Sequence, residues 1–412
     1  MSDLGYMKSA LGAARPRAVA ALLRYFRDLD LAEEAYQEAC LRALKVWPEN
    51  GPPRDPAGWL IMVGRNAALD SVRRSARQTP LCEAPPERVH GLPTDTEAEL
   101  VERLDDSHYR DDVLRLLFIC CHPELPSTQQ IALALRIVSG LSVPQIARAF
   151  VVTEAAMEQR ITRAKGKVAA AGVPFGNPTP AERAERLGAV AAMLQLVFNE
   201  GYSAAAEPER APLADEAIRL MRLLLRMFPA EPELMGLLAL MLLQHSRAAA
   251  RFGAAGEAIL LDDQDRSRWN TRLIHEGLAL IDKAMRHRAP GAYQVQAAIA
   301  ALHARASTPA DTDWAQIDLL YGTLERLTPS PVVTLNRAVA VSKVRGPEPA
   351  LAMVEPLGER LAGYFHFHGL RGGLLLQLGR PQEARAAFDR AIALATTAAE
   401  AAHIRMHLDR LR

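Results

Sequence analysis

The segment LSVPQIARAFVVTEAAMEQRITRAKGKV, residues 141–168, constrains the fold of this chain more than any other. Its pattern predicts two short helices, 142–150 and 153–167, joined by a tight turn, which together form a helix-turn-helix. In that motif the second helix enters the major groove of DNA, and basic side chains along it meet phosphates. The second helix here carries four basic residues in its C-terminal part: Arg160, Arg163, Lys165 and Lys167. The segment therefore indicates a DNA-binding module.

The length of 412 residues is too great for one compact core, so we expect two or three domains. A hydrophobic content of 49% with 24% charged residues is typical of a soluble globular protein. No apolar run approaches the roughly 18 residues that span a bilayer, and the N-terminus lacks an apolar signal-peptide region. Four cysteines do not make a disulfide framework in a chain of this length. We therefore expect a cytoplasmic protein without a membrane segment.

Positive charge is local in this chain, because the net charge is only +1. Residues 65–77 hold four arginines against a single acid: Arg65, Arg73, Arg74 and Arg77 with Asp70. A protein that grips DNA unaided usually carries a larger basic excess. The charge balance therefore favours a DNA-binding protein whose affinity comes largely from a bigger partner.

Clusters of proline, glycine and acidic residues divide the chain into helical blocks. Residues 1–77 and residues 109–171 have helical patterns, and the second block contains the helix-turn-helix. Between them, residues 78–108 are rich in proline and acid and are predicted to be a linker. After a break at 172–180, residues 181–412 have helical periodicity and no convincing strand alternation. We therefore expect an all-α fold.

The last part of the chain contains a faint internal repeat. The segments VRGPEPALAMVEPL and QLGRPQEARAAFDRAI place Gly346 and Gly379 33 positions apart, and Ala350 and Ala384 34 positions apart. A period near 34 is that of tetratricopeptide pairs, in which helical hairpins stack on one another. Residues 215–243 have the same helix–proline–helix rhythm. We favour a stack of helical hairpins, and an irregular helical bundle is the alternative.

Two helical segments near the N-terminus lie on either side of a Pro-rich break at 48–56. The first, residues 30–47, is expected to bury one face, formed by Leu31, Ala35, Ala39, Leu44 and Trp47. Its other face is acidic and amide-bearing. The second segment, residues 55–74, follows an Asp that can cap a helix, and it ends in the basic block.

The order of these segments resembles that of a bacterial sigma factor of the extracytoplasmic-function type. The chain contains, in this order, an acidic helix, a Pro-rich loop, a WL…RN…D…RR helix, an acidic linker and a helix-turn-helix ending in RAK. The resemblance identifies residues 1–77 with sigma region 2, 78–108 with the linker and 109–171 with region 4. Further segments resemble a subgroup with a C-terminal tetratricopeptide-like domain, here residues 181–412. They are LFICCHPEL (117–125), LVFNEGYSA (196–204), DDQDRSRWN (262–270), YQVQAAIAALHA (293–304) and SPVVTLNRAVAV (330–341).

The resemblance implies that the acidic face of the first segment docks on the clamp helices of the largest subunit of core RNA polymerase. This face comprises Asp30, Glu33, Glu34, Gln37 and Glu38. An acidic and amide-bearing surface is physically suited to a basic coiled coil. Taken in isolation, the same pattern indicates a solvated helix face.

The resemblance also assigns the loop at 51–58 and the helix after it to the promoter −10 element. The residues concerned are Trp59, Arg65, Asn66, Asp70, Arg73, Arg74 and Arg77. Reading this element requires a base held outside the stack and cations along the single strand. For Trp59 we favour the competing interpretation, which is a place in the core.

In region 4, the resemblance assigns the helix-turn-helix to the −35 element. The residues concerned are Ser142, Gln145, Thr153, Glu154, Glu158, Gln159, Arg160, Arg163, Lys165 and Lys167. In the major groove Gln suits adenine and Glu suits cytosine, whereas Arg and Lys also favour phosphates. The sequence departs from the usual family pattern at Ala156 and Glu158, so its −35 preference stays open.

The function implied by this resemblance is that of a subunit that directs core RNA polymerase to promoter DNA. The linker would pass through the polymerase cleft, where its negative charge mimics nucleic acid, and region 4 would meet the flap region. Polymerase does the chemistry, so we expect no enzymatic activity and no cofactor. The C-terminal domain is too large to be a simple tail. We expect it to regulate the sigma regions by packing against them or against polymerase.

Two other classes of protein stay open. A stand-alone helix-turn-helix regulator, with helical repeats that bind a ligand or peptide, would bind its operator tightly without polymerase. A scaffold protein that uses the repeats alone would leave the basic block at 65–77 unexplained.

Three patterns imitate metal sites. Cys120, Cys121 and His122 are adjacent, and neighbouring side chains on a helix point about 100° apart, so we expect buried thiols. His366 and His368 are two positions apart, which is poor spacing for a helical metal pair. Residues 262–270 lack the glycine of a calcium loop, and no P-loop, GxSxG or HExxH motif is present. We therefore expect no metal site.

Overall fold

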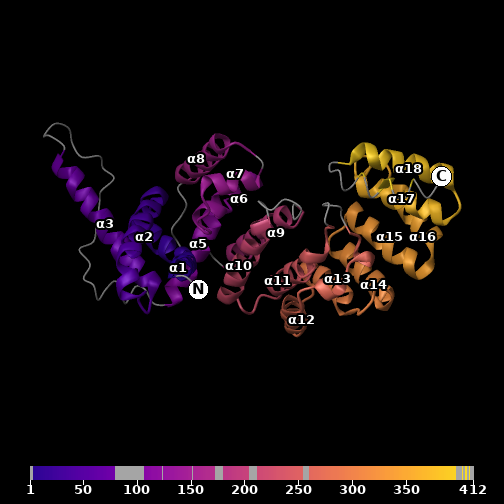
Figure 1. Ribbon diagram of the computed structural model, residues 1–412, viewed down its shortest axis with the longest axis horizontal. Coiled ribbons are helices and arrows are strands. Elements are labelled where there is room, and N and C mark those ends of the chain that lie inside the picture. Colours follow the sequence, from indigo (N-terminus) through magenta and orange to yellow (C-terminus); the bar gives the residue numbers. More distant parts are fainter. Residues whose placement is uncertain are drawn as a thin grey trace. The chain divides into compact units, whose positions relative to one another are not determined.

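A computed structural model describes residues 3–78, 106–122, 124–150, 152–171, 180–203, 211–253 and 259–395, with residues 401, 404, 405 and 408 (Figure 1). All elements in these ranges are α-helices or short 3₁₀ turns, which confirms the all-α prediction. The chain forms two compact units, residues 1–197 and 198–412. The predicted linker at 78–108 lies outside the described residues except at its two ends. None of the described helices is both long enough and apolar enough to cross a bilayer.

Three long helices begin the first unit and pack on one another: α1 (Asp3–Phe26), α2 (Leu29–Asn50) and α3 (Pro56–Gln78). Asp28 starts α2, because its carboxylate accepts hydrogen bonds from the backbone N–H groups of Asp30 and Leu31. Helices α2 and α3 approach closely at Gly64, where an added Cβ would lie 2.7 Å from the Ala35 carbonyl oxygen. A glycine is therefore required for this packing.

The helix-turn-helix is confirmed, with bounds close to those predicted. It consists of α7 (Val143–Ala149) and α8 (Glu154–Ala170), which pack with α6 (Ser127–Ile137). Helix α5 (Asp106–Cys120) precedes them and packs on α1 and α6. Ile146, Met157 and Ile161 are buried between these helices. Cys120 and Cys121 are buried free thiols, as expected, and burial raises the pKa of Cys121 to about 12.

Two side chains of α2 lie on the opposite side from the one predicted. Glu33, assigned to the polar face, is 4% exposed, and Leu44, assigned to the core, is 45% exposed. The register explains both errors. Glu33 is three positions before Tyr36 and ten before Ala43, so it shares a helix face with these buried residues. Leu44 is seven positions after Gln37, so it shares a face with that exposed residue. The expected break at 48–56 is also shorter, because α2 continues through Pro48 to Asn50.

The second unit is a succession of helices in which most pack on the next. Helix α9 (Pro180–Ser203) runs across the boundary between the units. The helices that follow are α10 (Ala211–Met227), α11 (Pro232–His245), α12 (Thr271–Met285), α13 (Ala292–Arg305), α14 (Trp314–Leu327), α15 (Pro331–Arg345), α16 (Pro347–Val354), α17 (Phe365–Gln377) and α18 (Pro381–Leu394). Helix α11 packs equally on α12 and α13. Packing mainly between neighbouring helices is typical of helical repeats.

The faint sequence repeat corresponds to two helical hairpins. Gly346 joins α15 to α16 with a φ of +91°, and Gly379 lies between α17 and α18 with a φ of +70°. Both values fall in the left-handed region that favours glycine. Ala350 and Ala384 are fully buried at matching places in the next helix. The 33-residue spacing therefore marks equivalent turns.

Candidate functional site

Three of the residues predicted to meet the −35 element also build the helix-turn-helix. The Ser142 N–H donates to Oε1 of Gln145 at 2.8 Å, and the Gln145 N–H donates to Oγ of Ser142 at 3.3 Å. This reciprocal pair is a capping box at the start of α7. Thr153 caps α8 by accepting from the N–H of Ala156 at 3.2 Å. These three residues therefore position α8 whatever else they contact.

The outer face of α8 carries a row of basic residues. Arg163 and Lys167 are exposed and Arg160 is half-buried, and their spacing places all three on one face. Gln159, also exposed, lies beside them. Lys165 lies about 200° around the helix from Arg163, because it is two positions away. The residues predicted to meet the −35 element therefore lie on two faces of α8. Lys165 lies on the face that also carries Glu154 and Glu158.

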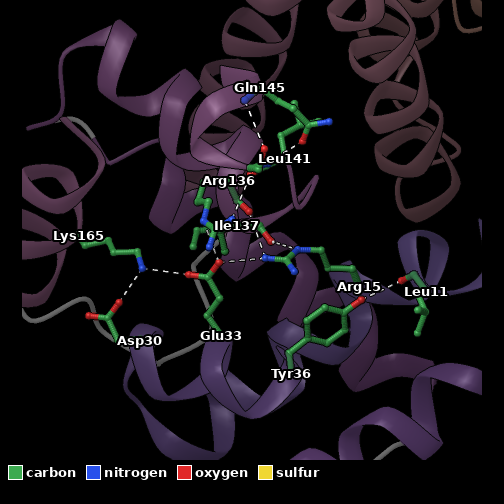
Figure 2. Close-up of polar contacts among 11 residues, drawn as sticks. Leu11, Arg15, Asp30, Glu33, Tyr36, Arg136, Ile137, Leu141, Gln145 and Lys165 are labelled. Atoms are coloured by element: carbon green, nitrogen blue, oxygen red, sulfur yellow. Dashed lines mark hydrogen bonds and ion pairs between the residues drawn. The ribbon is translucent and has the colours of Figure 1, made fainter. Parts of the chain in front are cut away.

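Lys165 contacts the acidic end of α2 (Figure 2). Its Nζ atom donates to Oδ1 of Asp30 at 2.6 Å and to Oε2 of Glu33 at 3.0 Å. Burial by itself would lower the pKa of Lys165, but the two carboxylates outweigh that effect and raise it. A basic residue predicted for DNA and two acidic residues predicted for polymerase are therefore paired with each other.

Glu33 is the centre of this ion-pair network, which joins α1, α2, α6 and α8. Its Oε1 atom accepts from Nη2 of Arg15 at 3.2 Å and forms an ion pair with Nε of Arg136 at 3.1 Å. Three cations thus surround one carboxylate that is almost fully buried. A buried carboxylate is tolerated only when several cations or donors pair with it, and these three cations explain why Glu33 can be buried.

Arg15, which the sequence analysis did not single out, connects the two sigma-like modules directly. Its Nε donates to the Ile137 carbonyl at 3.0 Å and its Nη2 to the Arg136 carbonyl at 3.1 Å (Figure 2). These carbonyls end α6, where the helix carries partial negative charge. The guanidinium also lies 4.8 Å from the centre of the Tyr36 ring. A second link is the ion pair of Arg24 with Asp112, at 3.2 Å.

The remaining part of the predicted docking face stays accessible. Glu34 and Gln37 are exposed, and Glu38 is half-buried and pairs with Arg42 at 3.2 Å. Two large apolar side chains are exposed on the same helix face: Leu41 is 55% exposed and Leu44 is 45% exposed. Positions 34, 37, 41 and 44 follow one helical face. We call these four residues the α2 stripe; its spacing could have revealed Leu41 from the sequence.

The residues predicted for the −10 element lie on α3. Trp59 is half-buried and meets Trp47 edge to face, with ring centres 5.4 Å apart. Arg65 donates to Oδ1 of Asn66 at 3.3 Å from Nη2, and its guanidinium faces the Tyr25 ring at 5.9 Å. Asn66 and Asp70 are exposed. Arg73, Arg74 and Arg77 belong to the last turns of α3, and their side chains lie outside the described structure.

The patterns that imitate metal sites have local roles. Asp265 accepts from the N–H of Ser267 at 3.0 Å, and Asn270 caps α12 by accepting from the N–H of Leu273 at 3.2 Å. The ring of His368 lies 2.9 Å from the Ala362 carbonyl oxygen. Each of these side chains completes a turn or a loop.

Comparisons with known proteins match three parts of the chain. Residues 12–78 match Sigma-70 region 2, residues 115–168 match Sigma-70, region 4, and residues 186–285 match a family of unknown function, DUF6596. The uncharacterized protein R00370 of Rhizobium meliloti (strain 1021) is 71% identical over 413 residues, which span all of this chain and 97% of that protein. The match to the crystal structure of yeast Tom70 covers 99% of this chain and 86% of that chain, at 14% identity and a TM-score of 0.37.

Region 2 followed by region 4 is the arrangement that defines a sigma factor of promoter-specific transcription. The chain belongs to the sigma-70 family and has the extracytoplasmic-function arrangement, followed by a C-terminal helical extension.

Proposed function

We propose that this protein binds core RNA polymerase and directs it to promoters through both sigma regions. The observation that carries the proposal is the α2 stripe, Glu34, Gln37, Leu41 and Leu44. It combines exposed polar groups with two large apolar side chains on one helix face. Surfaces of this composition are typical of protein interfaces and are unfavourable in water. Docking on the polymerase clamp helices would cover it.

The DNA contacts that we propose follow the exposed faces. Gln159, Arg160, Arg163 and Lys167 would engage the −35 duplex, and Asn66 with the basic end of α3 would engage the −10 strand. Trp59 would act mainly through its packing on Trp47. We propose that residues 1–77 and 109–171 act as two DNA-engaging modules joined by the linker at 78–108.

The network around Glu33 would then belong to the free protein. While Lys165 pairs with Asp30 and Glu33, Lys165 is less available to a phosphate and Asp30 is less available to polymerase. We propose that polymerase takes over Asp30 and releases Lys165 to the promoter backbone. This exchange would make −35 binding weak until polymerase is present.

The C-terminal domain at 181–412 would regulate these steps. Its size and its succession of packed helices support a binding function in place of a flexible tail. Residues 186–285 match a family whose function is unknown, so the proposal rests on the fold of this chain.

A reconstituted transcription assay tests the proposal. The full chain is mixed with core polymerase and a promoter library, and run-off transcripts are sequenced. We expect transcripts from a narrow set of templates that share two boxes, and none from core polymerase alone. Tight binding to an operator without polymerase, together with no specific transcripts, would instead identify a stand-alone regulator.

A further inference from the structure

The second unit contains a cluster of cationic side chains that the proposed function does not use. Tyr202, near the end of α9, supports two of them. Nη2 of Arg247 donates to the Tyr202 hydroxyl at 3.0 Å, and the Arg251 guanidinium lies 3.5 Å from the centre of the Tyr202 ring. Arg251 also donates to the Tyr202 carbonyl. Two guanidinium groups are therefore held on one aromatic side chain.

A third guanidinium, that of Arg266, is held near them by the pairing of two short turns. The 3₁₀ turn η1 (Ala248–Ala250), between Arg247 and Arg251, packs on η3 (Arg266–Arg268). Nη1 of Arg266 donates to the carbonyl oxygens of His303 and Ala306, both at 2.6 Å. The chain thus brings together three arginines from two separate segments.

Several donors in this cluster are buried but have no hydrogen-bond partner among the described residues. They are Nε and Nη2 of Arg266, Nε1 of Trp269 and Nδ1 of His303, which donates in one of its tautomers. Trp269 is only 5% exposed, and the Arg266 guanidinium lies 4.7 Å from its ring centre. Buried donors without an acceptor cost free energy, which an acceptor-rich ligand would recover.

The positive charge of the cluster is only partly compensated, because Asp262 and Asp311 attract Arg266 without forming an ion pair with it. Within the described ranges, none of Arg247, Arg251 and Arg266 forms an ion pair, and Asp262 pairs with Lys343 at 3.1 Å. Burial, together with Arg247, lowers the pKa of Arg251. Burial, Arg247 and Arg266 together lower the pKa of His303 to about 4. Cations that repel one another in this way are stabilised by an anion.

We propose that this cluster binds the phosphate group of a small molecule, held by Arg247, Arg251 and Arg266. Guanidinium forks match the oxygens of a phosphate, and three of them favour a dianion over a single carboxylate. Tyr202, Trp269 and His303 come from three of the segments that resemble the extended sigma subgroup, so residues about 100 positions apart build one site. The proposal does not depend on polymerase binding and goes beyond the proposed function.

Titration of the full chain with inorganic phosphate tests this proposal, with chloride at matched ionic strength as the reference. The His303 imidazole, followed by ¹⁵N NMR, reports on the site itself. We expect saturable binding and a rise in the His303 pKa of at least one unit, because phosphate offsets Arg247 and Arg266. A parallel titration with acetate distinguishes the ligand chemistry. Acetate that binds as tightly as phosphate would overturn the assignment to phosphate.

Two variants and a matched control localise the effect. Arg247→Gln and Arg251→Gln should each weaken phosphate binding at least tenfold, while Arg219→Gln, which disrupts only a pair with Glu216 on α10, should not. The wild-type titration stands by itself if a variant fails to fold. A non-saturable response, or one that is equal in the wild type and all variants, would contradict the proposal.

Discussion

Nζ of Lys165 lies 2.6 Å from the carboxylate of Asp30, although 135 positions separate the two residues. One belongs to the helix proposed to read the −35 element and the other to the face proposed to meet polymerase. Opposite charges at this distance attract strongly, and the ion pair persists until one of the two groups finds a stronger partner. The pair therefore gives the two modules a defined arrangement that binding would have to break.

Arg15→Gln should weaken the link between the modules without altering the α2 stripe or the outer face of α8. It removes a charged donor from two carbonyls that end α6, so we expect a loss of about 2 kcal/mol in the free energy of unfolding. Hydrogen exchange should accelerate in α6 and α8. Arg17→Gln is the control, because the Arg17–Asp55 pair lies within region 2. Equal exchange in both variants would show that Arg15 does not link the modules.

Gly140→Ala should destabilise the first unit. Gly140 has a φ of +74°, and an added Cβ would lie 2.6 Å from Cδ of Arg15. We expect a loss of roughly 1–3 kcal/mol, measured by urea unfolding. Gly166→Ala is the matched comparison on α8, where nothing lies within 4 Å of an added Cβ. It should stabilise the helix by up to about 1 kcal/mol. A lower free energy of unfolding for Gly166→Ala would contradict the predicted difference between the two positions.

His303 should make the second unit less stable as the pH falls. Its pKa is about 4 in the folded protein against an ordinary value of 6.5, so protonation favours the unfolded chain. Its contribution is fully present above pH 6.5 and is lost between pH 6.5 and 4, by at most about 3 kcal/mol. Urea unfolding at several pH values measures this slope, and His303→Gln should flatten it. An unchanged slope in the variant would exclude His303 as its source.

Asp318→Asn should destabilise the packing of α14 on α15. The buried carboxylate of Asp318 accepts from Nε of Arg337 at 2.7 Å and from Arg345, and these partners lower its pKa despite burial. Removing the charge should cost about 2 kcal/mol. Asp282→Asn, in an exposed pair with Arg305 at 3.6 Å, should cost under about 0.5 kcal/mol. Similar losses of unfolding free energy in both variants would show that the buried Asp318 pair stabilises the fold no more than an exposed pair does.

Local signals predicted much of this fold. The capping pair of Ser142 and Gln145 is three residues apart, and Gly346 and Gly379 mark turns through their own backbone preferences. Such features depend on neighbours in the sequence. The helix-turn-helix and the repeat could therefore be predicted with nearly correct bounds.

Contacts between distant segments could not be predicted in this way. Glu33 was predicted to lie on the exposed polymerase-docking face because it is acidic, but Arg15, Arg136 and Lys165 make its burial favourable. Those partners belong to three other helices. The sequence segments around Tyr202, Arg266 and His303 resemble the extended sigma subgroup, but only the fold brings them into one cluster.

Binding of core polymerase to two single variants tests the central claim most directly. Leu41→Asp places a charge on the α2 stripe, whereas Val46→Asp changes another exposed apolar residue of α2, 41% exposed, on another face. By co-sedimentation with the full chain, we predict that Leu41→Asp weakens binding at least tenfold and that Val46→Asp leaves it within twofold. Equal affinity of Leu41→Asp and the unmodified protein for core polymerase would contradict the account.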